Sequence, residues 1–99
     1  MIINKIDRKF GQLIKELRKK KNWTAKDFLE KLNIEGSKLS SSYITKIEVY
    51  GEIPSPEIIC KMADVLLFGV EALVELAKKI KITRFEKSLN EKYKKAIKN

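Results

Sequence analysis

The feature that most limits the fold is a helical spacing of apolar residues, which recurs in successive short segments of this 99-residue chain. In the first segment, apolar residues stand at positions i, i+3, i+4 and i+7, namely Phe10, Leu13, Ile14 and Leu17. This spacing places them on one side of a helix. No segment alternates between apolar and polar residues for long enough to predict a strand. The sequence therefore predicts an all-α fold.

The first two helices have recognisable ends. Asp7 is the predicted N-cap of the first helix, and lysines at 19–21 fill its last turn, where cations meet the negative end of the helix dipole. Thr24 and Asp27 then resemble a capping box, in which each side chain bonds the backbone amide of the other residue. We expect the second helix to run from this box to about Asn33.

A third and a fourth helix are predicted after a serine-rich interval. Helical spacing resumes over residues 43–48, and Gly51 closes this segment. Ser55 and Pro56 then give the strongest start signal in the chain, because Ser favours the N-cap and Pro the first helical position. Gly69 is expected to end the fourth helix, whose mostly buried residues are Ile58, Ile59, Met62, Ala63, Val65 and Leu66.

The remaining chain predicts a fifth helix and a tail. The fifth helix is defined by Val70, Leu73, Val74 and Ala77. From Lys78 onward, lysines surround one apolar stripe made of Ile82, Phe85, Leu89, Tyr93 and Ile97. We therefore predict a domain over residues 9–77 and a basic amphipathic C-terminal helix over residues 78–99, which needs a partner for its stripe.

The charge of the chain changes sign twice. The whole chain carries +9, with 22 Lys and Arg against 13 Asp and Glu. Residues 1–46 hold 12 basic and 5 acidic side chains, residues 47–77 hold 1 and 6, and residues 78–99 hold 9 and 2. Lys and Arg gain affinity for phosphate by releasing counterions, so this balance favours a nucleic acid as partner over a membrane.

Several function classes find little support. The chain has no histidine, no Gly-rich phosphate loop and no Cys or His cluster with metal spacing, so we expect neither an enzyme nor a cofactor or metal site. Its single cysteine, Cys60, permits no internal disulfide and is predicted to be a small buried hydrophobe. Without an apolar leader or membrane span, the expected location is the cytoplasm.

Taken in order, these helices resemble the lambda-repressor-like helix-turn-helix family, also called Xre or Cro-type. The resemblance is carried by residues 14–21, 23–32, 43–48 and 54–73, and it covers roughly residues 9–77. It implies a five-helix DNA-binding domain, here followed by the C-terminal amphipathic helix. It further implies a homodimer on double-stranded DNA, with the helix at about 41–48 in the major groove.

The resemblance assigns DNA contacts to the starts of the second and third helices. They fall on Thr24, Ala25, Lys26, Ser40, Ser41, Ser42, Thr45 and Lys46. Lys46 is the only long side chain on its face, and it either reads guanine acceptors or contacts only the backbone. The three serines are either a cap with two turn residues or part of a phosphate site, and the two interpretations are compatible. Lys26 and Lys38 are well placed for phosphate contacts.

The sequence departs from the family pattern at three places. Ala25 stands where the family usually has a Gln that bridges base and phosphate, so that contact is expected to be absent. Residues 34–38 resemble an insertion ahead of Leu39, in a turn that is normally three or four residues long. Residues 49–51 are one residue longer than the usual closure after the third helix.

Two further residues are predicted to stabilise the fold. The family often pairs a first-helix Arg with the Glu that ends the third helix, which here are Arg18 and Glu48. A guanidinium can bond a carboxylate at two points, so this pair is expected to pin the third helix to the first. Trp23, at the corner between the first two helices, is predicted to be a lid on the core.

The leading hypothesis is a sequence-specific transcriptional regulator that acts as a repressor. A second hypothesis is an antitoxin or phage-type immunity component, which binds DNA and also holds a protein partner through the acidic fourth and fifth helices or the basic tail. A coactivator that bridges proteins without reading DNA is the third and least favoured.

Overall fold

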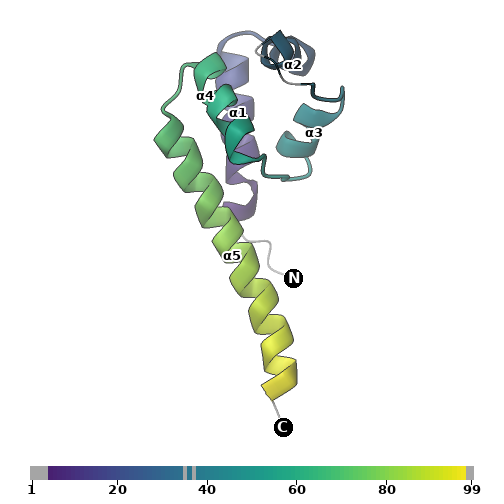
Figure 1. Cartoon of the computed structure of the whole chain (residues 1–99), viewed down its shortest axis with the longest axis vertical. Helices are drawn as coiled ribbons and strands as arrows, with labels where there is room; N and C mark the ends of the chain where they lie inside the picture. Colours follow the sequence, from purple (N-terminus) through teal and green to yellow (C-terminus); the bar gives the residue numbers. More distant parts are fainter. Residues whose placement is uncertain (1–4, 35, 37, 98–99) are drawn as a thin grey trace.

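Helices make up most of the chain, as the sequence predicted. The computed structural model describes residues 5–34, 36 and 38–97, and no strand is found among them. Five α-helices follow a short 3-10 helix, η1 (Lys5–Arg8) (Figure 1). They are α1 (Lys9–Lys20), α2 (Ala25–Ile34), α3 (Tyr43–Glu48), α4 (Pro56–Leu66) and α5 (Val70–Ile97).

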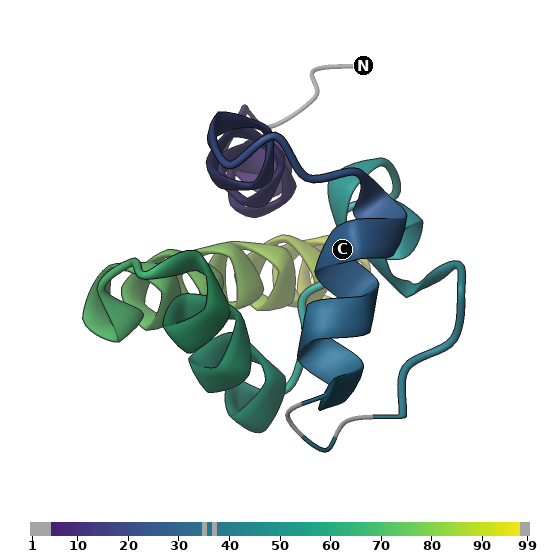
Figure 2. The same ribbon diagram turned by 90° about the horizontal axis from the view of Figure 1, so that it is seen from above.

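The first four helices gather at one end of the molecule, and α5 passes along them and continues beyond (Figure 1). The overall dimensions are therefore 55 × 24 × 24 Å. Seen from above, α2 and α3 lie beside each other on the opposite side of the domain from the α4–α5 corner (Figure 2). Helix α3 packs against both α1 and α2, so two elements determine its position.

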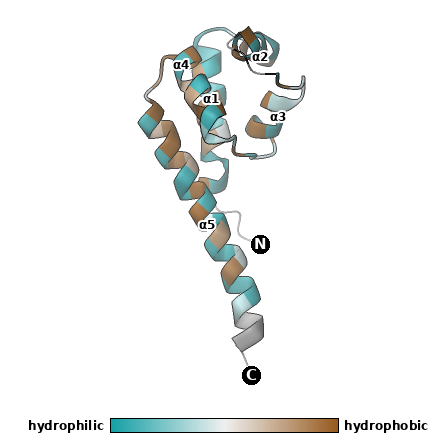
Figure 3. Ribbon diagram, viewed as in Figure 1, coloured by the Kyte–Doolittle hydropathy of each residue, from teal (hydrophilic) through white to brown (hydrophobic). Residues whose placement is uncertain are grey.

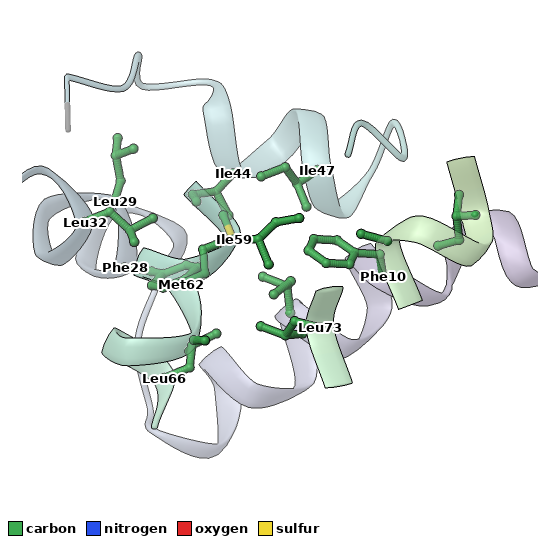
Figure 4. Packing of buried hydrophobic residues seen from close by; sticks show 14 residues of the cluster. Phe10, Phe28, Leu29, Leu32, Ile44, Ile47, Ile59, Met62, Leu66 and Leu73 are labelled. Carbon is green, nitrogen blue, oxygen red and sulfur yellow. The ribbon is translucent and has the colours of Figure 1, made fainter. Parts of the chain in front are cut away.

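One core draws residues from every helix. Figure 4 shows the buried apolar side chains converging between the helices, with Phe10 of α1 and Phe28 of α2 fully enclosed. Burying one such side chain stabilises the fold by roughly 1.5–3 kcal/mol. Among the described residues, no buried side-chain nitrogen or oxygen lacks a hydrogen-bond partner. The core is therefore apolar, with its few polar groups satisfied.

Helix α1 approaches α3 unusually closely at Gly11. A Cβ atom at this position would lie 2.3 Å from the carbonyl oxygen of Ile47 and 3.0 Å from the Cα of Glu48. Both are backbone atoms, which cannot rotate aside. Only glycine fits here without moving a helix, a requirement that the sequence analysis missed.

The two strongest capping predictions are confirmed. The amide of Asp27 donates to Thr24 Oγ1 at 3.0 Å, and the amide of Thr24 donates to Asp27 Oδ2 at 2.9 Å, which completes the capping box of α2. Ser55 is the N-cap of α4, where its Oγ accepts from the amide of Ile58 at 3.4 Å, and Pro56 begins the helix.

Three local predictions are wrong. Arg8, not Asp7, is the N-cap residue of α1, because η1 precedes this helix directly and Asp7 instead pairs with Arg84. Helix α4 ends at Leu66, not at Gly69, because Leu67 adopts a left-handed conformation with φ 55°. Cys60 is exposed.

The position of Cys60 follows from the face that α4 turns toward the core. Ile59, Met62, Ala63 and Leu66 are buried and stand at i, i+3, i+4 and i+7. Cys60 follows Ile59 by one residue, which rotates it about 100° away from the first member of this face. It therefore points to solvent.

The predicted fifth helix and the predicted tail form one continuous helix, α5. The helix continues without a break across the predicted boundary between Ala77 and Lys78, and Ile80, just beyond this boundary, is fully buried in the core. Figure 3 shows apolar residues continuing along the part of α5 that projects from the domain. The side chain of Ile97, the last member of the predicted stripe, lies outside the described side chains.

Candidate nucleic-acid interface

Helix α3 has one buried face and one exposed face. Ile44 and Ile47 point into the core, while Ser42, Thr45 and Lys46 are exposed. The buried pair holds the short helix against α1 and α2, so its outer residues are presented by packed elements. A face carried by a packed helix is positioned more precisely than one carried by a loop.

Arg18 and Glu48 form the predicted ion pair between α1 and α3. Arg18 Nε donates to Glu48 Oε2 at 2.9 Å, and Arg18 Nη2 donates to Glu48 Oε1 at 2.8 Å. Both side chains are largely buried, with 9% and 6% of their surface exposed. The hydrogen bond to Glu48 raises the pKa of Arg18 above its ordinary value, although burial opposes this.

The same guanidinium also reaches the α1–α2 corner. Arg18 Nη1 donates to the carbonyl oxygen of Trp23 at 2.7 Å. One side chain thus joins α1, the corner and the end of α3. Its role is structural, since its donors point inward to these partners.

Trp23 covers the core at this corner, as predicted. Its ring stacks near Phe28 with centroids 6.3 Å apart. The ammonium groups of Lys31 and Lys21 lie 4.8 Å and 5.5 Å from the Trp23 centroid. These cation–π contacts attract both lysines to the protein's own surface.

The long turn after α3 is held by two arginines from distant elements. Arg8 donates through Nη1 to the carbonyl oxygen of Val49, and Arg84 of α5 donates to that of Gly51 at 2.7 Å. Gly51 has a φ of 75°, which suits glycine, and the amide of Glu52 returns to the carbonyl oxygen of Lys46 at 3.0 Å. The turn over residues 49–51 is therefore held by specific hydrogen bonds.

Arg84 is a structural residue that the sequence analysis missed. Its Nε donates to Asp7 Oδ1 at 2.6 Å, and its Nη2 also donates to the backbone oxygen of Asp7 at 3.3 Å. Because it bonds both η1 and the turn after α3, Arg84 links α5 to that turn. Arg84 and Asp7 are 77 positions apart, and no local sequence pattern predicts a contact over that distance.

Asn33 organises the long connection between α2 and α3. Its Oδ1 accepts from the amide of Leu39 at 2.9 Å, and its Nδ2 donates to the carbonyl oxygen of Leu39 at 3.4 Å. Leu39 is half-buried against the core, so the connection is anchored before the serines. Residues 35 and 37 of the predicted insertion lie outside the described residues.

The serines lead directly into α3. Ser42 is its N-cap residue, but its side chain makes no capping hydrogen bond. Instead, the hydroxyl oxygens of Ser40 and Ser42 lie 3.4 Å apart, and the amide of Tyr43 donates to the carbonyl oxygen of Ser40 at 3.0 Å. Ser40, Ser41 and Ser42 are exposed, as is Lys38 before them.

The residues at the start of α2 have different surroundings. The Thr24 hydroxyl is engaged in the capping box, and Ala25 packs partly against the core. Lys26 is exposed. The hydrogen bonds from Thr24 lower the pKa of Asp27 below its ordinary value, with smaller contributions from Lys31 and Lys26. Among the predicted contacts at the start of α2, Lys26 is the one with an exposed cationic side chain.

Two exposed residues beyond α3 were not predicted. Val49 continues the outer face because it follows Ser42 and Lys46 at helical spacing. Tyr50, next to it, has 73% of its surface exposed. Apolar residues just before a glycine that ends a helical segment, as Gly51 does here, resemble core positions in a sequence. The sequence therefore did not predict that Val49 and Tyr50 are exposed.

A comparison with known protein families identifies the family of this chain. A family model described as helix-turn-helix matches residues 14–68, which is more than half of the chain. No curated protein and no solved structure is similar enough to count as a match. Among the described residues, no helix is long and apolar enough to cross a membrane, and no group of three or more His, Cys, Asp or Glu could hold a metal ion.

Proposed function

The chain belongs to the lambda-repressor-like helix-turn-helix family of DNA-binding regulators, and on that premise we propose that it binds double-stranded DNA sequence-specifically and represses transcription by occupying a promoter. It acts as a homodimer in the cytoplasm, without catalysis. The observation that carries the proposal is the outer face of α3. Its exposed side chains are short except for Lys46, so the helix backbone can approach base edges closely.

Lys46 supplies most of the direct reading in this proposal. Its ammonium is a donor that matches the O6 and N7 acceptors of guanine, whereas Ser and Thr are ambiguous single-point partners. A good base contact discriminates by roughly 1–3 kcal/mol. Val49 lies on the same face and offers an apolar surface to a thymine methyl group.

Phosphate contacts position the domain. Lys26 and Lys38 are exposed at the approaches to α2 and α3, where they can neutralise backbone charge. Each contact of this kind steepens the dependence of log affinity on log salt by roughly 0.9. Ser40, Ser41 and Thr45 add hydroxyl donors without base selectivity.

The test compares affinities for a duplex selected from a random pool and for random duplex, by fluorescence anisotropy at several salt concentrations. Lys46→Ala should weaken binding to the selected duplex roughly 5- to 150-fold and change random binding little. Lys26→Ala should weaken both and reduce the salt slope by about one. Lys79→Ala, on an exposed position of α5, is the matched control.

Two results would contradict the proposal. Equal affinity of the wild type for selected and random duplex would remove the sequence specificity. An equal loss on both duplexes for Lys46→Ala would assign Lys46 to the backbone instead of the bases.

The second candidate is an antitoxin or immunity component with a protein partner. It is favoured by four exposed carboxylates on α4 and α5, at Glu57, Asp64, Glu71 and Glu75. Reversing two of these charges, as in Asp64→Lys with Glu71→Lys, should then leave DNA affinity intact while abolishing function in cells. Unchanged function in cells would reject this candidate.

A further inference from the structure

The projecting part of α5 exposes a row of large apolar side chains. Ile82, Phe85, Leu89 and Tyr93 have 56%, 66%, 41% and 56% of their surfaces exposed. They follow one another at spacings of three or four residues, so they share one face of the helix. Contiguous exposed apolar surface of this kind marks an interaction site in a soluble protein.

This row does not face the chain's own domain. Leu73, Ala77 and Ile80 are buried, and Arg84 bonds Asp7 and the turn after α3, so these four define the inner face of α5. At 100° per residue, the exposed row is centred about 150° from that inner face. The C-terminal part of α5 extends past the other helices (Figure 1). Bending the row back onto the domain would require breaking α5.

We infer that this row is the homodimer interface, in which α5 of one chain pairs in parallel with α5 of a second copy. The inference rests on the proposed DNA-binding function, and it identifies the partner surface that this function needs.

The charged residues beside the row are complementary between two copies only when the two helices run parallel. If Ile82 is heptad position a, Phe85 is d and Leu89 is the next a, with Lys81 at g and Glu86 at e. In a parallel pair, Lys81 faces Glu86 of the second copy, and the reverse contact forms by symmetry. An antiparallel pair sets like positions side by side and loses both contacts. The lysine and the glutamate therefore favour the parallel orientation.

The available area predicts a weak dimer. An aromatic side chain offers roughly 150–250 Å². Scaling by the exposed fractions lets Ile82, Phe85 and Leu89 of the seam, with Tyr93 flanking it at position e, bury roughly 800 Å² over both copies. Stable interfaces bury about 1,200–2,000 Å², so we expect dissociation in the micromolar range or above. Lys92, at the next d position, ends the apolar seam.

A parallel pair suits a two-fold DNA site. Both domains then lie at the same end of the paired helices, and the molecule is 24 Å across its short axes. Two such domains side by side can address half-sites one helical turn apart, roughly 34 Å. Binding to both half-sites then strengthens a dimer that is weak in solution.

Dimerisation and DNA binding should depend on salt in different ways. Residues 78–99 hold 9 basic and 2 acidic side chains, so pairing brings two basic segments together. Added salt screens their repulsion and should strengthen the dimer, whereas it weakens DNA binding. The two properties therefore respond in opposite directions.

The experiment is sedimentation equilibrium of the full chain from 5 to 500 µM, in low and high salt. The wild type should show a monomer–dimer equilibrium that shifts toward dimer in high salt. Leu89→Glu should weaken dimerisation at least tenfold, while Lys87→Glu, at the heptad position farthest from the seam, should not. Because Leu89 is partly exposed and outside the core, helicity measured by circular dichroism should be unchanged.

Orientation is tested by crosslinking. In a Cys60→Ser background, Ile82→Cys should form a disulfide dimer under mild oxidation, since only a parallel pair places the two copies of residue 82 together. A chain that stays monomeric at every concentration, or a dimer unaffected by Leu89→Glu, would overturn the inference. Absence of the Ile82→Cys crosslink in a dimer sensitive to Leu89→Glu would overturn the parallel arrangement.

Binding to a half-site duplex distinguishes failure of the dimer interface from failure of the proposed DNA-binding function. A half-site duplex needs one domain only, so Leu89→Glu should bind it with wild-type affinity. If the wild type binds the selected half-site but never dimerises, the inference fails and the proposed function stands.

Discussion

Gly11→Ala is the substitution that most directly tests how α1 and α3 are packed. The added Cβ would lie 2.3 Å from the carbonyl oxygen of Ile47, whereas ordinary van der Waals contact begins near 3.4 Å. The two helices would have to separate by about 1 Å. The second close atom, the Cα of Glu48, belongs to the residue that pairs with Arg18, so the shift would disturb that ion pair as well.

The expected magnitude is a difference between two opposing effects. Alanine in a helix interior is favoured over glycine by about 1 kcal/mol. Overpacking against atoms that cannot rotate aside costs roughly 3 kcal/mol. We therefore expect a net loss of about 2 kcal/mol in the free energy of unfolding, or a fall of roughly 10 °C in Tm for a chain of this size.

The assay is urea unfolding followed by circular dichroism at 222 nm and by Trp23 fluorescence. Gly69→Ala is the matched control, because its Cβ would meet nothing within 4 Å and its backbone is not left-handed. This control has no steric cost, so its stability should change by no more than about 1 kcal/mol and should not fall by the amount expected for Gly11→Ala. If Gly11→Ala were as stable as the wild type, or more so, the close approach of the two helices would be refuted.

Three other substitutions probe separate features. Arg18→Met leaves the Glu48 carboxylate buried without its partner and should lower the free energy of unfolding in urea by about 3 kcal/mol. The double variant, Arg18→Met with Glu48→Leu, should lose clearly less than the sum of the two single losses. Additive losses would argue against the ion pair. Hydrogen bonds from Thr24 hold the pKa of Asp27 below its ordinary 3.8, so the capping box contributes stability above that pH and loses it as the pH falls through the lowered pKa. Asp27→Asn should therefore be less stable at pH 7 and lose less stability than the wild type on acidification below pH 4, and parallel pH profiles would contradict this. Leu67→Gly relieves a left-handed conformation at an exposed position and should raise the free energy of unfolding by about 0.5–1 kcal/mol, a gain that thermal unfolding would detect and that an unchanged Tm would disprove.

The predictions that succeeded rest on interactions between residues close in sequence. The capping box of Thr24 and Asp27 joins residues three positions apart, and the cap at Ser55 reaches Ile58. Apolar spacing correctly assigned Ile44 and Ile47 to the buried face of α3. Such patterns are visible in sequence because helix geometry alone brings these residues together.

The predictions that failed depended on a choice between local and distant partners. Asp7 fits a helix start by sequence, but Arg84 offers it a charged partner at 2.6 Å. Cys60 is typical of a buried residue by type, yet it lies beside the face of α4 that the core uses. In both cases the residue type allowed two environments, and packing selected one.

The candidate interface shows the same division. The sequence by itself determined an all-α chain, the helix that carries Lys46 and the family to which that helix belongs. Only the tertiary structure decided that Gly11 must admit the backbone of α3, and that Arg84 ties α5 to the turn beyond it. The physical reason is range: caps and periodicity act within a few residues, whereas close packing and bonds across 33 to 77 positions exist only once the helices have met.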